Sequence, residues 1–282
     1  MKVVISADME GTAGVTCWAE TERDKPDYPE FQALMTAEVT AACNGALDAG
    51  ATGIIVKDAH HTGRNLLVDR LPAEVRIVRD WSGHPHSMMF AIDGDCAAAI
   101  CTGYHDAAGT DSNPLAHSFT GRIMRRTING ALASEFTVNA ITAASLGVPS
   151  AFLSGDAGIC AAAEALVPGI VTLPVSRGFG PATSSLSPVC ARDRLREGVA
   201  RAPSRPAGRA VGGRAGVRQP RRGLSRQLLS RRRLLRAAPL AICPQRLVRG
   251  AADPAFPVVK PRRPRGDIFT TFYNDTAYDL RE

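Results

Sequence analysis

The feature that most constrains the fold is an alternation of strand and helix patterns over roughly the first 200 residues. KVVISA at residues 2–7 and GIIVKD at 53–58 are apolar runs of strand length. Between them, residues 29–49 place apolar side chains near a 3.6-residue period, which predicts a helix. Such alternation is typical of an α/β fold with a mostly parallel sheet and flanking helices. Further strand patterns lie at 75–81, 96–105, 150–156 and 170–175, and further helical patterns at 135–146 and 158–169.

Glycine marks several turns in this part of the chain. Asn129-Gly130 lies between two short runs, which is the usual signal for a tight β-hairpin. Gly147 is expected to end the helix that begins at residue 135. Gly11 and Gly14 follow the first strand, where we expect them to let the backbone turn sharply.

Three predicted strands end in side chains that can bind a metal ion. Asp8 ends the first strand, Asp58 and His60 follow the second, and His105 follows the strand at 96–105. In sheets of this class, ligands gather at the carboxyl ends of the strands. Asp8 and Glu10 are two positions apart, so in an extended segment they project to the same side and can face one ion together.

The candidate set mixes carboxylates with imidazoles. These donors suit zinc, or manganese or cobalt in its place, and exclude a metal that prefers thiolates. Because the set is larger than one ion uses, it suggests two ions bridged by a carboxylate, an arrangement that can polarise a carbonyl and generate hydroxide. The candidates are Asp8, Glu10, His60, His105, His117 and Glu135.

Each candidate taken alone also has a plain structural interpretation. An Asp at a strand end is usually solvated, and Glu135 could simply favour the positive end of a helix that begins there. His84 and His86 have a metal-like spacing, but Pro85 indicates a surface turn and no acid accompanies them. We therefore interpret these two histidines, together with His61, as residues outside any metal site.

Four motifs, in this order and spacing, carry a family resemblance: SADMEGTAGV, VKDAHHTGRNL, TGYHDAAGTDSNPLAHSF and ASEFTVNAITAASLGVPSAFLSGD. Together they resemble the D-aminopeptidase DppA family of zinc metallopeptidases, peptidase family M55. The resemblance covers roughly residues 1–200, where LSPVCARDRLREGVARA still matches a family helix. Residues 1–202 are thus expected to form a metal-binding α/β domain.

The resemblance also implies roles for single residues. The family's metal ligands fall on Asp8, Glu10, His60, His105 and Glu135, and its catalytic histidine falls on His117. Two zinc ions per chain are implied, with Asp8 as the bridge, Glu10 and His105 on one ion, and His60 and Glu135 on the other. His117 would act on the proton of the leaving amine or stabilise the tetrahedral species. A direct nucleophilic role for His117 has the same sequence requirement and stays open.

The activity implied by the resemblance is removal of N-terminal D-residues, such as D-Ala, from short peptides. The implied assembly is a ring-forming homo-oligomer, such as a decamer, with the sites inside. Two rival functions rest on the residues themselves. A two-metal phosphoesterase could also place Asp and His at strand ends, although its G-N-H-[DE] type of motif is absent. A non-enzymatic basic binding protein would rest on residues 203–250 alone.

Charge divides the chain into two unlike parts. Residues 1–180 hold 12 Lys and Arg against 20 Asp and Glu, a net charge of −8, whereas residues 181–282 hold 22 against 7, a net charge of +15. No acid occurs between Glu197 and Asp253, in a stretch dominated by Arg, Ala, Gly, Pro and Leu. The family resemblance stops near residue 202, where the family completes a second lobe, so that lobe is expected to be disrupted in this chain.

Three explanations of the basic region compete. It could bind nucleic-acid phosphates, or LSRQLLSRRRLLRAAPLAI could lie on a membrane as a basic amphipathic helix. The third is a reading-frame shift in a GC-rich gene, since such codons read out of frame give mostly Arg, Pro, Ala and Gly. We favour the third because composition changes abruptly where the family match ends. We therefore expect neither a nucleic-acid nor a membrane partner, and treat residues 203–282 as a region of doubtful fold and the activity of this particular chain as open.

Cysteine usage predicts the compartment. The seven cysteines are odd in number, scattered and without a C-x-x-C pair, which favours free thiols in a reducing environment over a disulfide scaffold. No stretch reaches the roughly 20 apolar residues of a transmembrane helix. We therefore expect a cytoplasmic location.

Overall fold

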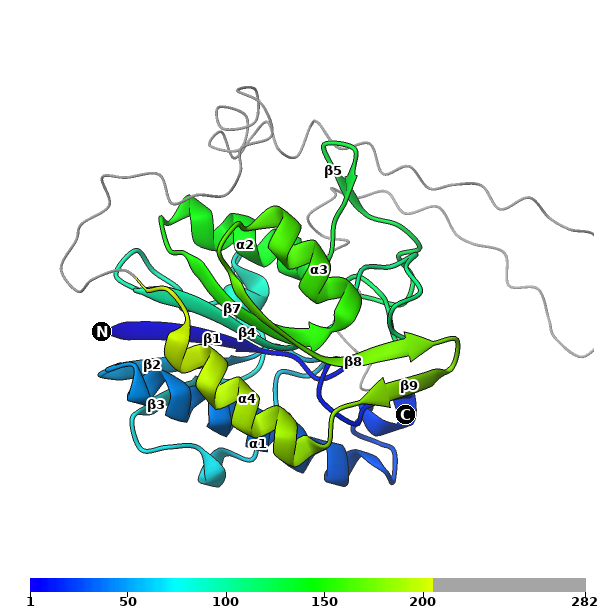
Figure 1. Ribbon diagram of the computed structural model, residues 1–282, viewed down its shortest axis with the longest axis horizontal. Coiled ribbons are helices and arrows are strands. Elements are labelled where there is room, and N and C mark those ends of the chain that lie inside the picture. Colours follow the sequence, from blue (N-terminus) through cyan, green and yellow to red (C-terminus); the bar gives the residue numbers. More distant parts are fainter. Residues whose placement is uncertain (205–282) are drawn as a thin grey trace, which may run out of the picture. The chain divides into compact units, whose positions relative to one another are not determined.

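The computed structural model describes residues 1–204 of the chain. Their main feature is a seven-stranded sheet in the order β3-β2-β1-β4-β7-β8-β9 (Figure 1). All neighbouring strands run parallel except β9, which pairs antiparallel with β8. The predicted α/β fold with a mostly parallel sheet is therefore confirmed. The expectations for residues 205–282, a disrupted second lobe included, fall outside the described residues.

The strands and helices follow the sequence patterns closely. The sheet strands are β1 (Lys2–Ala7), β2 (Gly53–Asp58), β3 (Val75–Val78), β4 (Ala98–Tyr104), β7 (Ser150–Asp156), β8 (Val171–Phe179) and β9 (Ala182–Ser185). The α-helices are α1 (Tyr28–Asp48), α2 (Glu135–Ser145), α3 (Ala157–Leu166) and α4 (Pro188–Arg201). Short 3-10 helices lie at η1 (Trp18–Glu20), η2 (Val68–Arg70) and η3 (Ser87–Met89), and β5 (Thr127–Ile128) pairs with β6 (Ala131–Leu132) as a separate hairpin.

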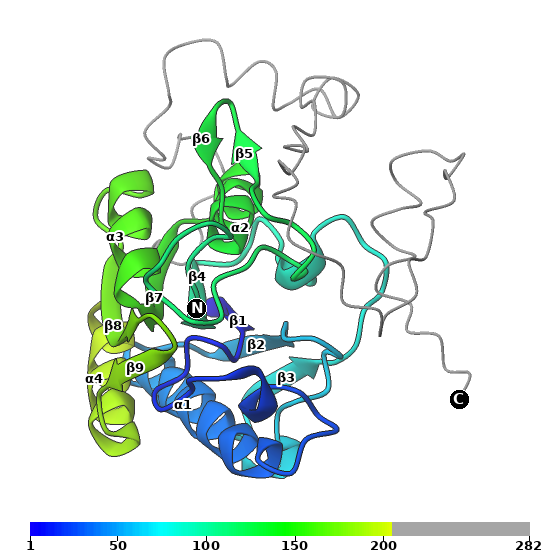
Figure 2. The same cartoon turned by 90° about the vertical axis from the view of Figure 1, so that its right-hand side faces the viewer.

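Helices cover both faces of the sheet. The helices α1 and α4 pack side by side on one face, and α2 and α3 cover the other (Figures 1 and 2). A bidentate ion pair between Arg196 of α4 and Asp48 of α1, at 2.6 and 3.0 Å, joins the first two helices at the surface. Each buried strand thus has a hydrophobic layer on either side, as a parallel sheet requires.

The order of the strands creates a switch point beside β1. The chain passes from β1 outward to β2 and β3, then returns to place β4 on the other side of β1. Such a switch point, at the carboxyl ends of the strands, is where ligands bind in sheets of this class. The carboxyl ends of the strands form the edge of the sheet that faces the viewer in Figure 2.

Two glycines let the loops after β1 and β4 approach closely. A Cβ on Gly11 would overlap the carbonyl oxygen of Tyr104, and a Cβ on Gly103 would overlap that of Asp8. Gly103 also has a φ of 68°, which is unfavourable for other residues. The role of Gly11 is thus close packing of the backbone rather than the sharp turn expected from the sequence, whereas Gly14 does turn, with a φ of 97°.

The predicted turns at 129–130 and 147 are confirmed. Asn129 and Gly130 both have positive φ, 52° and 82°, as the tight turn between β5 and β6 demands. Gly147 follows α2 with a φ of 71° and ends it. Among the described helices, none combines the length and apolar character that crossing a bilayer needs.

Candidate metal centre

The six candidate residues converge at the switch point of the sheet. Asp8 and Glu10 follow β1, His60 follows β2, and His105 follows β4. Glu135 is the first residue of α2. All five of these side chains are buried. His117 arrives on the loop between β4 and the β5–β6 hairpin and is half-buried. The structure therefore brings together every residue of the predicted set.

One group of ligand atoms consists of Asp8, Glu10 and His60. The Nδ1 atom of His60 lies 3.1 Å from Oε2 of Glu10 and 3.3 Å from Oδ1 of Asp8. Its other ring nitrogen, Nε2, lies 2.9 Å from the carbonyl oxygen of Thr21 and donates to it. In the neutral imidazole this bond keeps the proton on Nε2, so that Nδ1 is the nitrogen available to bind a metal ion beside the two carboxylates.

The second group consists of Asp8, His105 and Glu135. Nε2 of His105 lies 3.6 Å from Oδ2 of Asp8 and 3.5 Å from Oε1 of Glu135. Nδ1 of His105 donates to the carbonyl oxygen of Asp106 at 2.9 Å, which again leaves the inner nitrogen as an acceptor. Among the described residues, Oδ2 of Asp8 and Nε2 of His105 are buried and lack a hydrogen-bond partner. A cation between them would satisfy both.

Asp8 belongs to both groups, with one carboxylate oxygen toward each. A bridging carboxylate has this form. These two groups join Glu10 to His60 and Glu135 to His105, whereas a third group, which contains Glu10, His105 and His117, keeps the expected partnership of Glu10 with His105. The pairing of the ligands on two ions therefore stays a prediction.

The buried charges of the two groups balance one another. Burial, reinforced by the charge of Glu10, raises the pKa of Asp8 well above its usual value. Burial would also raise the pKa of Glu10, but the charge of His60 outweighs it and lowers that pKa. Burial would lower the pKa of His60 and of His105, yet the facing carboxylates Glu10 and Glu135, respectively, raise both well above the usual range. A divalent cation that displaces the protons of His60 and His105 would supply this positive charge to the carboxylates in their place.

His117 approaches the two groups from the side. Its ring stacks on that of His105, with centroids 4.2 Å apart and planes 12° from parallel. Nδ1 of His117 donates to the carbonyl oxygen of Leu115 at 2.9 Å, so Nε2 faces the carboxylates, 3.7 Å from Glu135 and 3.9 Å from Glu10. His117 also forms a third possible ligand group with Glu10 and His105.

The donor set fits zinc. Carboxylate oxygens and imidazole nitrogens are zinc ligands, each histidine has an outer hydrogen bond that orients it, and two inner atoms are without partners. The histidines set aside from the sequence, His61, His84 and His86, belong to none of the ligand groups found among the described residues.

Several supporting residues lie outside the predicted set. The Asp58 carboxylate accepts bonds from the backbone N–H groups of Asn65 and Leu66, at 2.5 and 2.8 Å, and so holds the loop that carries His60. Asp156 accepts from the backbone of Asp106 at 2.8 Å and from the side chain of Asn113 at 3.1 Å. The loop between His105 and His117 is thus tied to the start of α3.

Trp18 is a neighbour of His117 for which the sequence has no signal. Its ring meets that of His117 edge to face, with centroids 5.3 Å apart. Trp18 comes from η1, and nothing in its spacing to the motif after β1 indicates this contact. Only the path of the chain after Gly14 brings it there.

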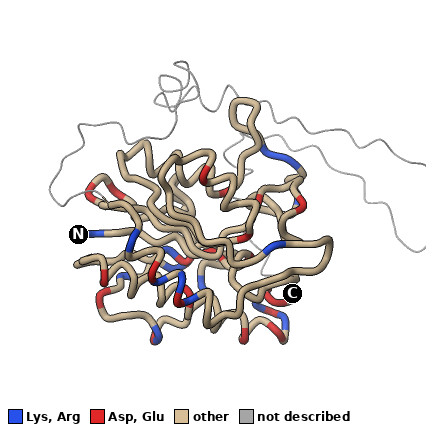
Figure 3. Tube along the Cα trace, viewed as in Figure 1, with Lys and Arg blue, Asp and Glu red and all other residues tan. Residues whose placement is uncertain are grey.

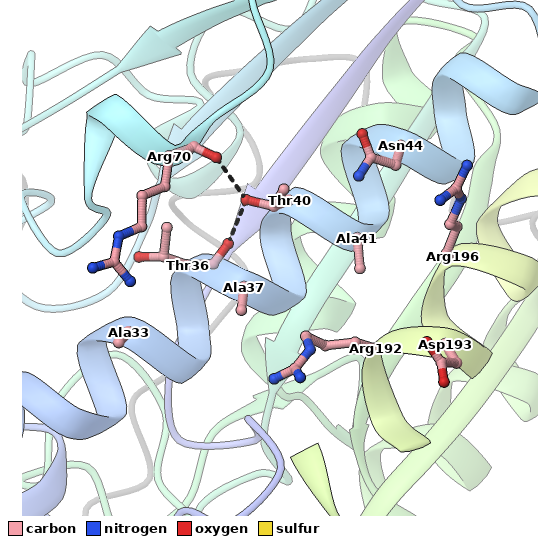
Figure 4. Close-up of a pocket in the computed structure, with 10 residues that line it drawn as sticks. All are labelled: Ala33, Thr36, Ala37, Thr40, Ala41, Asn44, Arg70, Arg192, Asp193 and Arg196. Carbon is pink, nitrogen blue, oxygen red and sulfur yellow. Dashed lines mark hydrogen bonds between the residues drawn. The ribbon is translucent and has the colours of Figure 1, made fainter. Parts of the chain in front are cut away.

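A separate pocket of about 370 Å³ lies between α1, Arg70 and α4 (Figure 4). Small side chains of α1, including Ala37 and Ala41, form its floor, and Arg70 and Arg192 lie at its rim. The hydroxyl of Thr40 donates to the carbonyl oxygens of Thr36 and Arg70 at this place. None of the candidate metal ligands lines this pocket.

Comparison with known proteins decides the family. The model of the D-aminopeptidase family, peptidase family M55, matches residues 1–212. This chain belongs to the D-aminopeptidase family. A D-aminopeptidase of Bacillus subtilis (strain 168) is 31% identical over 203 residues, which cover 71% of this chain and 73% of the relative. The resemblance inferred from the four motifs is therefore confirmed.

A solved structure agrees with the sequence match. The zinc-dependent D-aminopeptidase DppA from Bacillus subtilis, described as a self-compartmentalizing protease, aligns with a TM-score of 0.68 at 29% identity. The alignment covers 71% of this chain and 73% of that one. The chain is thus a member of a family of metallo-aminopeptidases, with the α/β fold of a zinc-dependent relative.

Proposed function

We propose that this chain is a zinc-dependent aminopeptidase that removes N-terminal D-amino acids, such as D-Ala, from short peptides. The observation that carries the proposal is the pair of buried ligand groups that share Asp8. The proposed ligands of two zinc ions are Asp8, Glu10, His60, His105 and Glu135, and the proposed catalytic residue is His117. Family membership and the zinc dependence of the solved relative support this choice of metal and reaction.

Zinc bound at this place would polarise a carbonyl and lower the pKa of a bound water. The chain's own residues supply the other requirements. The hydrogen bonds of His60 to Thr21 and of His105 to Asp106 hold both imidazoles with their inner nitrogens ready to bind. His117, held through its Nδ1–H, presents Nε2 as a group that can carry a proton to the leaving amine.

The proposal extends to assembly and location. The relative described as self-compartmentalizing supports a homo-oligomeric ring, such as a decamer, that encloses the sites. Five of the described cysteines are free thiols, which supports the proposed cytoplasmic location: Cys17, Cys43, Cys101, Cys160 and Cys190. Peptides with N-terminal D-residues are the proposed partners, and neither nucleic acid nor membrane is.

Metal analysis tests the centre. The purified chain is expected to hold about two zinc ions, and Asp8→Ala is expected to lose most of both, because each ligand group loses the carboxylate that they share. Elemental analysis of dialysed protein gives the count. Asp69→Ala, which removes an exposed carboxylate of η2, is the matched control and should keep the full load. A full zinc load in Asp8→Ala would refute the bridging role.

Hydrolysis tests the activity on the same samples. The loaded chain should cleave D-alanyl-D-alanine faster than L-alanyl-L-alanine, and the metal-stripped chain should cleave neither until zinc is restored. Equal rates on both dipeptides would support the aminopeptidase activity and refute the preference for N-terminal D-residues. Absence of cleavage by a chain that holds two zinc ions would reject the proposed reaction.

A further inference from the structure

Residues 120–132 form an arm that stands away from the body of the protein. The arm contains the β5–β6 hairpin, and both views show it projecting beyond the helices (Figures 1 and 2). None of its residues is buried. A two-stranded hairpin is marginally stable on its own, so a protruding one of this kind gains most when a partner covers it.

The arm exposes apolar side chains. Met124 is 73% exposed and Leu132 is 39% exposed, and both are large. Large apolar side chains that are exposed on one short element beside charged ones suit an interaction surface. The arm also carries three arginines, at 122, 125 and 126, while the sequence has no acid between Asp111 and Glu135.

A surface of opposite charge lies on the same molecule. Residues 18–30, which we name the acidic segment, include η1 and the start of α1. The stretch 20–30 has five acids against Arg23 and Lys25, a net charge of −3, which is opposite in sign to the charge of the arm. Figure 3 shows the arginines at the base of the arm and the mixed, mainly acidic stretch as separate coloured regions. Trp18, 42% exposed, adds an apolar side chain to this segment.

We propose that the arm of one copy docks on the acidic segment of a second copy. A second copy is the favoured occupant because one chain carries both complementary surfaces. Two unlike surfaces on one chain make a head-to-tail contact, and such contacts generate a ring when the rotation closes. The inference rests on the proposed function, because the ring proposed there is the assembly in which this contact would join neighbouring copies.

Both surfaces connect directly to the candidate metal centre. At the base of the arm, the guanidinium of Arg126 lies 4.4 Å over the ring of Phe119. The backbone N–H of Phe119 donates to Oε1 of Glu135 at 2.6 Å. In the acidic segment, Trp18 contacts His117, and the carbonyl of Thr21 accepts from His60. Docking therefore stabilises the position of Glu135 in the copy that supplies the arm, and the positions of His60 and His117 in the copy that supplies the acidic segment.

Sedimentation velocity of the full chain, over a range of protein concentrations, tests the contact. The wild-type chain should associate, and Met124→Asp should weaken association at least tenfold, because it places a carboxylate in the apolar part of the interface. Val189→Asp is the matched control: Val189 is 59% exposed on α4, away from the arm, and its replacement should leave association unchanged.

A charge exchange tests the partner. Arg125→Glu and Asp24→Arg should each weaken association, and the double variant should recover it, since the exchanged charges meet again across the interface. A monomeric wild-type chain at every concentration, or a Met124→Asp chain that associates like Val189→Asp, would overturn the proposal. Failure of the double variant to recover would overturn the assignment of the acidic segment.

Metal content and dipeptide cleavage, measured on the same samples, separate the two proposals. A chain that holds zinc and associates through the arm but cleaves no dipeptide rejects the proposed function and leaves the contact standing. A chain that cleaves D-alanyl-D-alanine while Met124→Asp associates normally rejects the contact and leaves the function standing. If both proposals hold, Met124→Asp should retain zinc and lose turnover in proportion to its loss of association.

Discussion

His117 differs from the five proposed ligands in how it is held. It is half-buried, stacks on His105, and contacts the exposed Trp18, whereas the others are buried around the two groups of ligand atoms. A side chain at the rim can meet a substrate that enters from solvent. The stacked arrangement also places it near enough to Glu10 and Glu135 to serve as a ligand, so its role needs a test of its own.

We expect His117→Ala to keep both zinc ions and to lose roughly 100-fold in kcat, the loss typical of a general acid–base group. The reason is that a group acting on the leaving amine matters in the transition state and little for holding metal. Zinc content and kcat on D-alanyl-D-alanine are the two measurements. Loss of an ion would make His117 a ligand, and unchanged turnover would make it a bystander.

At the scale of the elements, the sequence predicted the strands and helices well because their periodicity is strong. β1, β2 and β7 match their expected bounds, and α1 differs by one residue at each end. The edge strand β9 was not predicted, since ATSS has no apolar alternation and exists only by pairing with β8. The residues of the centre could be listed from motifs, whereas their grouping and the contact of Trp18 depend on how distant loops meet.

The helix α1 is coupled to the loop after β1 through Glu38. This buried carboxylate accepts the backbone N–H of Ala13 at 2.9 Å, and its other oxygen has no hydrogen-bond partner among the described residues. Burial raises the pKa of Glu38 to about 7, while the Ala13 N–H and the charge of Arg192 act in the opposite direction. Ionisation of Glu38 therefore destabilises the folded chain.

Because the folded pKa lies above the unfolded one, Glu38 holds a proton in the folded state that the unfolded state has lost. Its contribution to stability is full below pH 4.5 and is lost as pH rises through about 7. Relative to Glu38→Gln, the wild-type chain should lose up to about 3 kcal/mol of unfolding free energy between pH 4.5 and 8. Urea unfolding at several pH values measures this. Glu30→Gln, which removes an exposed carboxylate of the same helix, is the matched control variant.

At the scale of the whole molecule, the sequence predicts that the family-like composition ends near residue 202, and the family comparison ends its match close to that point. The family model ends at residue 212, somewhat beyond the predicted boundary near 202. The division of the chain at 202 stays a prediction, as does the origin of the basic region. All proposed ligands lie before either boundary, so the site is encoded whatever follows.

Re-reading the coding DNA after codon 200 in the other two frames tests the explanation of the basic region. If the frame shifts there, one of these frames should encode sequence with ordinary mixed charge that extends the match to the D-aminopeptidase family. Failure of both frames to extend the match would favour a genuine basic segment. Affinity of the full chain for duplex DNA, falling steeply with salt, would then point to phosphate contacts.

The position of the arm between His117 and Glu135 bears on how relatives of this chain can diverge. The residues that flank the arm, Phe119 and Glu135, anchor it at the centre through one hydrogen bond, while Asn129 and Gly130 of its turn are both exposed. Residues inserted or deleted at that turn change the reach of the arm without moving either anchor. Differences in chain length among relatives should therefore occur at this turn. Such differences would change how the copies associate and leave the residues of the metal centre unchanged.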